Sequence, residues 1–260
     1  MTLGNIVAAL AIIGCSSSCA GTANPRADAG DTNTYVIVHG AWGGGWAFKA
    51  LDSLLTSRGH KVYRPTMTGL GERVHLANSD IDLGTHIEDI VNTIRFEELD
   101  DVVLVAHSYG GMVASGVAHR IPERLRCVIF FDAFLPEDGE SLLAMSRGTA
   151  REAFVQQLVA SARGGLIAPP GQFDPLTRDA SQPVRTLTEP VEMNNPAGHA
   201  LPGKYILTVL AGTEEADDTF APYAARARDR DWTVIVMEGD HVPVGAEWEE
   251  LARLLVDLPR

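Results

Sequence analysis

The sequence predicts an α/β fold with a mostly parallel sheet flanked by helices, and three observations support this prediction. Short apolar runs alternate with segments of helical periodicity, which is typical of βαβ units. Several of these runs are continuously apolar, as in strands that are buried on both faces. The 260 residues are enough for one large domain with a sizeable core.

The expected elements follow one another in a regular order. Strands are expected at 35–38, 61–64, 102–106, 127–131, 205–210 and 233–237, and helices at 46–57, 85–98, 110–119, 220–228 and 247–255. The second of these helices is expected to open at Thr85, with Glu88 completing a capping box.

The regular order breaks between residues 136 and 203. Pro and Gly are frequent in this segment, and helical periodicity is weak outside 152–162. We interpret 136–203 as an insertion within a single domain that spans residues 31–260.

The first 30 residues differ in composition from the rest of the chain. Residues 6–13 form an apolar run that is too short to span a bilayer and suits a signal peptide. This run leads into Cys15, as in a bacterial lipoprotein signal, and a spacer rich in Ser, Ala and Gly follows. We therefore expect export to the cell envelope or secretion, with Cys15 as a candidate membrane tether. The alternatives are cleavage after Ala20 and a mis-assigned start codon, which would leave the protein in the cytoplasm.

Charge and cysteine content exclude several classes of protein. The net charge is −13 and Lys and Arg form no run, so nucleic acid and anionic membrane surfaces are poor partners. The three cysteines cannot form a disulfide framework, and Cys127 is expected to be a buried free thiol. No Cys/His cluster indicates a metal, no other cofactor is expected, and no feature indicates a protein partner.

The strongest local signal for chemistry is the segment 102–111. An apolar strand leads into Ala106-His107-Ser108-Tyr109-Gly110, and a helical pattern follows. A small-x-Ser-x-Gly motif between a strand and a helix is typical of a nucleophile elbow, which exposes a Ser hydroxyl at the carboxyl edge of the sheet. Ser108 is therefore the candidate nucleophile, and a helix-capping role is its alternative.

A Ser nucleophile requires a general base, and His241 is the best-placed histidine because it follows the last expected strand. The acid that would orient His241 has two candidates. Asp132 ends the strand at 127–131, whereas Glu215 follows the strand at 205–210. We favour Asp132 and keep Glu215 as the alternative.

An oxyanion hole needs two backbone N–H groups directed at the developing negative charge. One is expected from Tyr109, at the start of the helix after the nucleophile. The other is expected from the glycine-rich loop 39–46, where residues such as Gly40 let the backbone approach a substrate closely. A phosphate-binding loop is disfavoured here because the segment lacks the spacing and the Lys of a P-loop.

Residues 35–258 resemble the α/β-hydrolases, in particular the esterase branch that includes plant methylesterases and hydroxynitrile lyases. They look closest to bacterial carbendazim-hydrolysing esterases. The matching stretches are 39–46, 66–73, 106–112, 131–136 and 240–244. The resemblance implies that Ala41 and Tyr109 supply the oxyanion N–H groups and that 136–203 is a lid. It also supports Asp132 as the acid, since the bacterial branch keeps an Asp there.

The resemblance implies hydrolysis of a small-molecule ester through an acyl-enzyme. Lyases of this group carry Thr at the position of Gly40 and Lys at the position of Val242, so hydrolysis is favoured over cyanide chemistry. Trp42 is expected to contact substrate, together with apolar lid side chains: Leu166, Ile167, Pro169, Pro170 and Phe173. These side chains favour an apolar, uncharged ester, and carbamates or amides fit the same machinery. A non-catalytic ligand-binding module is the alternative from another class.

Overall fold

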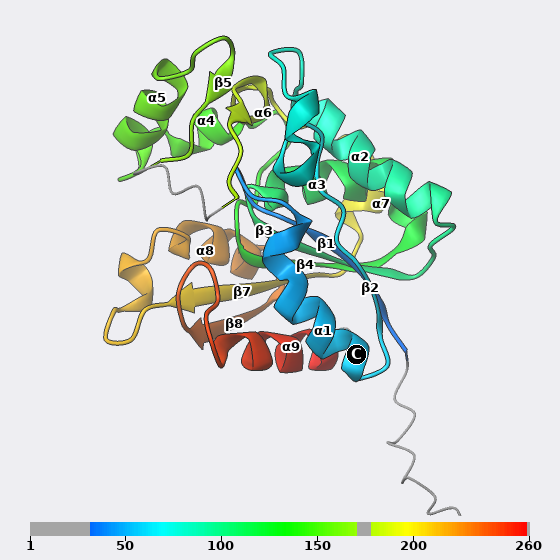
Figure 1. Ribbon diagram of the computed structural model, residues 1–260. Helices are drawn as coiled ribbons and strands as arrows, with labels where there is room; N and C mark the ends of the chain where they lie inside the picture. The colour runs from blue at the N-terminus through cyan, green and yellow to red at the C-terminus, as the bar shows by residue number, and fades with distance from the viewer. Residues whose placement is uncertain (1–31, 171–177, 259–260) are drawn as a thin grey trace, which may run out of the picture. The chain divides into compact units, whose positions relative to one another are not determined.

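The computed structural model describes residues 32–170 and 178–258. The expected leader with Cys15, and Phe173 of the expected lid, lie outside the described residues. Within the described ranges, six strands form one parallel sheet in the order β2-β1-β3-β4-β7-β8 (Figure 1). Their bounds are β1 Thr34–Val38, β2 Lys61–Tyr63, β3 Val102–Ser108, β4 Leu125–Ala133, β7 Gly203–Val209 and β8 Thr233–Glu238.

Helices connect these strands and cover both faces of the sheet. The longer ones are α1 Lys49–Ser57, α2 Leu83–Phe96, α3 Gly110–Arg120, α8 Ala221–Asp229 and α9 Glu247–Asp257. Short 3-10 helices occupy η1 Gly45–Phe48, η2 Gly71–Leu76, η3 Pro122–Arg124 and η4 Glu215–Asp217. Every strand and helix expected outside the insertion is present, so the predicted α/β class is confirmed.

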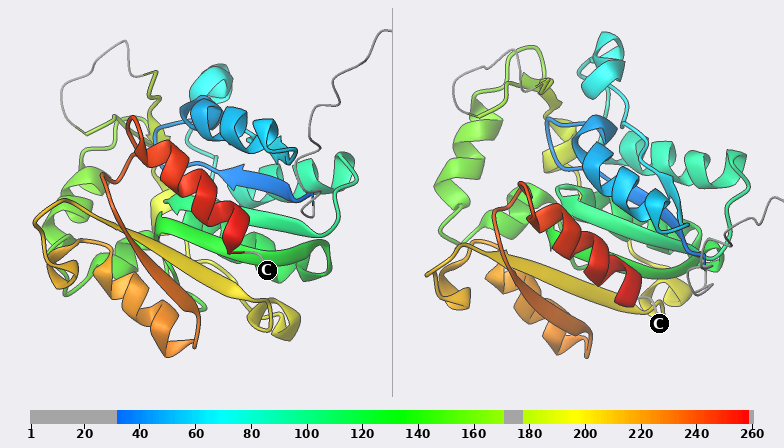
Figure 2. Two further views of the ribbon diagram at one scale, coloured as in Figure 1. Left: turned by 90° about the horizontal axis from the view of Figure 1, so that it is seen from below. Right: turned by 60° about the horizontal axis from the view of Figure 1, so that its bottom comes forward.

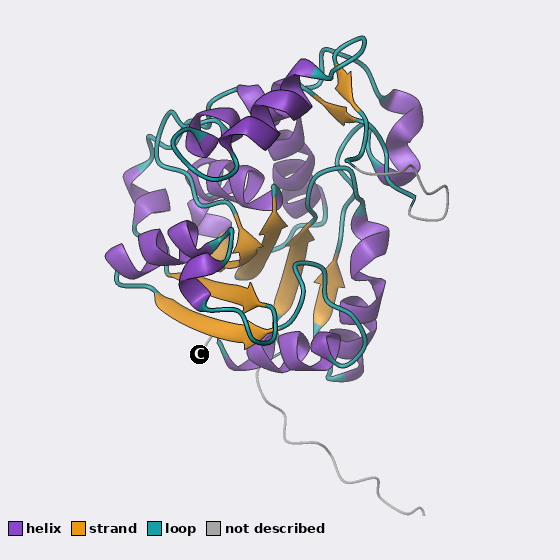
Figure 3. Ribbon diagram, turned by 90° about the vertical axis from the view of Figure 1, so that its left-hand side faces the viewer, coloured by secondary structure: helices purple, strands orange, loops and turns teal. Residues whose placement is uncertain are grey.

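The strands alternate their side chains between two apolar layers, as the two-residue period of a strand requires. In β1, Tyr35 and Ile37 join the layer beneath α1 and α9, whereas Val36 and Val38 face α2, α3 and α8. Figure 2 shows α1 and α9 side by side on one face, and Figure 3 shows the strands enclosed between helices. Cys127 of β4 is buried as expected, and burial raises the pKa of its thiol to about 11.

The start of α2 differs from the prediction. The N-cap residue is Asp82, whose carboxylate accepts the Thr85 N–H at 2.7 Å, while the Thr85 hydroxyl closes the capping box. Thr85 is therefore the third residue of the helix rather than its cap. Asp is as good an N-cap as Thr, and the helical pattern extends one turn further back than was expected.

The insertion between β4 and β7 contains short elements: α4 Leu142–Ser146, α5 Glu152–Ala160, β5 Leu166–Ile167, β6 Gln182–Pro183, α6 Arg185–Thr188 and α7 Pro196–His199. β5 and β6 form a separate antiparallel pair. Figure 1 shows α4, α5, β5 and α6 grouped at one end of the sheet. By contrast, α7 packs near His119 at the opposite end of α3 from Ser108. No helix in the described ranges is long and apolar enough to cross a membrane.

Candidate active site

Ser108 is the last residue of β3 and occupies a tight strand-to-helix turn. Its φ of +53° lies in the left-handed region, which non-glycine residues rarely adopt. A Cβ on Gly110 would lie 2.5 Å from the Val38 carbonyl oxygen, and one on Gly111 would lie 1.9 Å from that of Phe134. The turn is therefore pressed between the ends of β1 and β4, which explains the glycines that follow Ser108.

Three residues that are distant in sequence form one line of hydrogen bonds. The Ser108 hydroxyl lies 3.1 Å from Nε2 of His241, and Nδ1 of His241 lies 2.5 Å from Oδ2 of Asp132. In the tautomer that satisfies both contacts, Nδ1–H donates to the carboxylate and Nε2 accepts from the serine. Nε2 is then free to take the proton of the Ser108 hydroxyl.

Asp132 is buried, with 2% of its side chain exposed, and both of its carboxylate oxygens have partners. Oδ1 accepts the backbone N–H of Thr208 in β7 at 3.0 Å, and Oδ2 accepts from His241. A buried carboxylate is tolerated only when it is hydrogen-bonded in this way. Asp132 also has a φ of +43°, so strain accompanies its placement at the end of β4.

The alternative acid, Glu215, has another partner. It begins η4, and its carboxylate forms an ion pair with Arg228 of α8 at 2.7 Å. The structure thus brings Asp132, and not Glu215, into contact with His241.

Two aromatic rings contact the His241 side chain, and no pattern in the sequence predicts either contact. The Phe220 ring stacks on the His241 ring at 4.8 Å with an interplanar angle of 11°. The His107 ring lies 4.7 Å from that of His241, and its Nε2–H donates to the His241 carbonyl oxygen at 2.8 Å. Burial and the neighbouring His241 lower the pKa of His107 to about 3, so His107 is the neutral donor at physiological pH.

Arg151 of the insertion reaches the same cluster. Its guanidinium carbon lies 4.8 Å from the centre of the Phe220 ring, a cation–π distance. Its Nη1 atom is buried and has no hydrogen-bond partner among the described residues, and burial lowers the pKa of the side chain. No spacing rule links residue 151 to residue 220, so only the folded chain reveals this contact.

The glycine-rich loop lies close to Ser108. A Cβ on Gly40 would lie 3.0 Å from the Cβ of Ser108 and 3.5 Å from its Oγ. Trp42 has a φ of +62°, and its indole Nε1–H donates to the carbonyl oxygen of Ile167 in the insertion. Ala41 therefore lies between Gly40, which is close to Ser108, and Trp42, which is hydrogen-bonded to the insertion.

Tyr109, the other expected oxyanion residue, is the N-cap of α3, and its side chain is fully buried. Its hydroxyl lies 3.0 Å from Nδ1 of His86. Across residues 32–170 and 178–258, no group of three or more His, Cys, Asp or Glu side chains could hold a metal ion.

A parallel sheet with a serine on a strained strand-to-helix turn, next to a His–Asp pair, defines the class of α/β hydrolases. Residues 35–254 match the sequence model of the alpha/beta hydrolase family, and the chain belongs to this family. The resemblance expected from the sequence is thereby confirmed.

The matched relatives include esterases. The chain is 51% identical over 111 residues to the carbendazim hydrolyzing esterase of Nocardioides sp. (strain SG-4G), covering 43% of this chain and 46% of that protein. It is 29% identical over 106 residues to salicylic acid-binding protein 2 of Nicotiana tabacum, covering 40% of each. The chain thus spans less than half the length of these two relatives.

Among solved structures, an extracellular α/β-hydrolase from a Paenibacillus species superposes with a TM-score of 0.72. The two chains are 22% identical, and the match covers 86% of this chain and 98% of the other. This similarity concerns the fold, and it confirms the predicted α/β-hydrolase architecture.

Proposed function

We propose that this protein is a serine esterase that hydrolyses small, mainly apolar, uncharged carboxylic esters through an acyl-enzyme. One observation carries the proposal: the unbroken hydrogen-bonded line from Ser108 through His241 to Asp132. A serine hydroxyl is a poor nucleophile on its own, and this line supplies a base that is oriented by a buried acid.

In the first half of the reaction, Oγ of Ser108 attacks the ester carbonyl carbon while its proton passes to Nε2 of His241. The carbonyl electrons move onto oxygen, and the N–H groups of Ala41 and Tyr109 bind the resulting oxyanion. The Asp132 carboxylate stabilises the imidazolium of His241. The imidazolium then protonates the leaving alkoxide, the carbon–oxygen bond breaks, and the acyl group remains on Ser108.

In the second half, His241 takes a proton from a water molecule, whose oxygen attacks the acyl carbon. The oxyanion forms again in the same hole, Oγ of Ser108 leaves with the proton from His241, and the carboxylic acid is released. Ester and water are thus converted to acid and alcohol, and the enzyme returns to its starting protonation state.

The preference for an apolar ester is supported by Trp42 and by the insertion, which we propose acts as a lid. The indole of Trp42 donates to the carbonyl of Ile167 at 3.2 Å, so the insertion reaches the edge of the catalytic loop. Carbamates and amides are the alternative substrates, because the same triad cleaves them.

Hydroxynitrile lyase chemistry is a weaker alternative. Gly40 contributes no hydroxyl beside Ser108, and Val242 contributes no positive charge next to His241. Export of the chain, with lipid on Cys15, also remains a proposal. It predicts palmitate labelling that Cys15→Ala abolishes, and a full-length chain confined to the cytoplasm contradicts it.

A panel of aryl esters, carbamates and anilides with graded acyl chains tests the function. We expect hydrolysis of the short esters, with a burst of alcohol equal to the enzyme concentration wherever deacylation is rate-limiting. Ser108→Ala should lower kcat by at least about three orders of magnitude. Retention of most of the ester hydrolysis by Ser108→Ala contradicts the proposal.

A further inference from the structure

We propose that Gln182 and Thr186, two buried polar side chains of the insertion, are positioning residues that hold both oxyanion-hole donors in place. The pair contacts the residue after Ala41 at one end and Tyr109 at the other. The inference rests on the proposed function, because the oxyanion hole belongs to the proposed hydrolysis.

The first contact fixes the loop that carries Ala41. The backbone N–H of Trp42 donates to Oε1 of Gln182 at 2.9 Å, and the Trp42 carbonyl accepts the N–H of Ala180 at 2.8 Å. Trp42 has a φ of +62°. This conformation costs a non-glycine residue free energy, and it persists only where the surrounding structure imposes it. The peptide between Ala41 and Trp42 is therefore held in a strained orientation by the insertion.

Gln182 can hold the Trp42 N–H in place because the oxygen and the nitrogen of its own amide are both hydrogen-bonded. The side chain has no exposed surface, and its Nε2–H donates to the hydroxyl of Thr186 at 2.7 Å. The Thr186 hydroxyl in turn donates to the Pro183 carbonyl at 2.6 Å. Since Oε1 faces a backbone donor and Nε2 faces a hydroxyl, the amide has one satisfied orientation.

The second contact reaches Tyr109. Thr186 also lies against the phenol of Tyr109, and burial raises the pKa of that phenol well above its ordinary value. His86 Nε2–H donates to the Thr68 carbonyl at 2.9 Å, so Nδ1 accepts the Tyr109 hydroxyl proton. The phenol is therefore hydrogen-bonded to His86 on one side and contacts Thr186 on the other, and the backbone N–H of Tyr109 is the second expected oxyanion donor.

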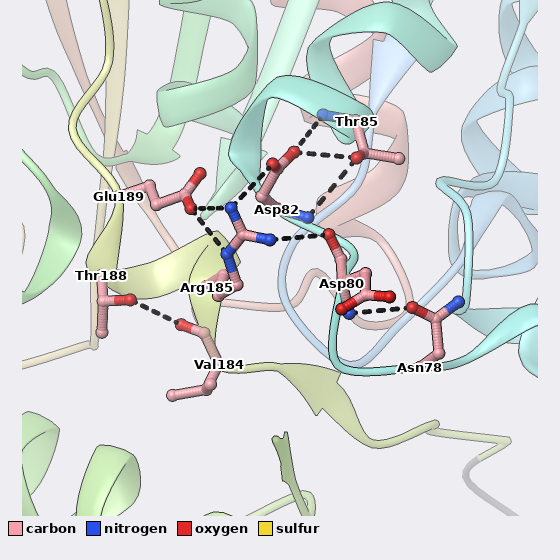
Figure 4. Close-up of polar contacts among 8 residues, drawn as sticks. All are labelled: Asn78, Asp80, Asp82, Thr85, Val184, Arg185, Thr188 and Glu189. Atoms are coloured by element: carbon pink, nitrogen blue, oxygen red, sulfur yellow. Dashed lines mark hydrogen bonds and ion pairs between the residues drawn. The ribbon is translucent and has the colours of Figure 1, made fainter. Parts of the chain in front are cut away.

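Arg185 also ties Gln182 and Thr186 to the core. Figure 4 shows Arg185, which lies between them in sequence, bound to Asp82, Glu189 and the Asp80 carbonyl. Asp82 is the N-cap of α2, so α6 is attached to the start of a core helix. Gln182 and Thr186 therefore connect the core to the loop that carries Ala41.

This arrangement predicts a kinetic signature. Oxyanion donors act on charge that develops in the transition state, so their displacement lowers kcat and leaves substrate binding nearly unchanged. Loss of the Oε1 acceptor would leave the Trp42 N–H without a partner and release the strained peptide.

The test compares Gln182→Met and Thr186→Val with Thr186→Ser, and it uses Gln157→Met on the exposed surface of α5 as the matched control. The readouts are kcat, KM and the inhibition constant of an aryl trifluoromethyl ketone, which forms an oxyanion on the serine. Gln182→Met and Thr186→Val should lower kcat roughly 10- to 100-fold and weaken the inhibitor by a similar factor. KM should change by less than about threefold in all variants, and Thr186→Ser and Gln157→Met should behave as the wild type.

A second measurement is independent of turnover. Amide hydrogen exchange in residues 40–46 should accelerate in Gln182→Met and remain unchanged in Gln157→Met. Unchanged loop exchange, or a folded Gln182→Met with wild-type kcat and inhibitor affinity, overturns the inference while leaving the esterase proposal intact. Absence of ester hydrolysis and of ketone binding in the wild type overturns the proposed function. The exchange data then still decide whether Gln182 positions the loop.

Discussion

Nδ1 of His241 lies 2.5 Å from Oδ2 of Asp132, a contact between residues that are 109 positions apart in the chain. The second oxygen of Asp132 accepts the Thr208 N–H, so the carboxylate is fixed from both sides before it meets the imidazole. This geometry makes Asp132 the group that sets the tautomer of His241.

The first prediction concerns that acid. Asp132→Asn should lower kcat by roughly 10³- to 10⁴-fold, because an amide can no longer hold Nδ1 of His241 as the donor. The matched variant Glu215→Gln should stay within about twofold, since it breaks only a partly exposed ion pair with Arg228. The measurement is steady-state hydrolysis of a short aryl ester. Collapse of kcat in Glu215→Gln alone contradicts the assignment.

The second prediction concerns the space next to Ser108, the proposed nucleophile. Gly40→Thr should lower kcat/KM at least about tenfold, because its Cβ would lie 3.0 Å from that of Ser108 and crowd the attacking oxygen. In the same loop, a Cβ on Gly43 would meet its nearest atom at 3.9 Å, so Gly43→Ala is the control and should keep nearly full activity. Equal losses of kcat/KM in both variants would contradict this prediction, because they would show that any side chain added to the loop lowers activity.

The third prediction concerns the His107 ring, which lies beside His241, the proposed base. His107→Leu removes the donor to the His241 carbonyl and should lower kcat roughly two- to tenfold, as expected for the loss of one hydrogen bond. His107→Gln keeps an N–H donor at a similar reach and should recover much of the activity. An unaltered kcat in His107→Leu, with its fold verified by circular dichroism, counts against a positioning role.

The fourth prediction concerns pH and stability. Burial lowers the pKa of His39 to about 4 and that of His107 to about 3, whereas an unfolded histidine titrates near ~6.5. Below ~6.5 the unfolded chain therefore binds more protons than the folded chain, so stability falls as pH decreases toward 4.

Urea unfolding measures this dependence. The midpoint should decrease steadily from pH 7 to pH 4.5, and the decrease should be shallower in His107→Gln, which lacks one of the histidines with a lowered pKa. Gln157→Met, on the exposed surface of α5, provides the control and should leave the slope unchanged. A midpoint that is constant or rises on acidification contradicts the prediction.

Much of the fold could be predicted from the sequence because buried parallel strands and amphipathic helices leave strong periodic patterns. The segment 102–111 is the clearest case, since the apolar strand, the turn and the helix are contiguous. The placement of Asp132 at the end of β4 and of His241 in the loop after β8 could also be predicted, because the carboxyl ends of parallel strands meet at one edge. The N-cap of α2 is Asp82, three residues before the predicted Thr85, because Asp and Thr are both good capping residues.

The contacts that depend on the insertion could not be predicted. Gln182 contacts Trp42 from 140 positions away, and Arg151 contacts Phe220, which follows β7 in the sequence, so neither contact has a local pattern. Phe220 and His107 resemble ordinary core aromatics in the sequence, and only the structure shows that their rings contact His241. Residues that act through long-range packing leave no period or spacing to detect.

Covalent labelling with a fluorophosphonate tests the central claim, that Ser108 is a nucleophile activated by His241, most directly. Peptide mass spectrometry should locate one adduct per chain on Ser108, with none in Ser108→Ala and much slower labelling in His241→Ala. An adduct on another residue contradicts the account. So does a wild-type chain that hydrolyses esters without any labelling of Ser108.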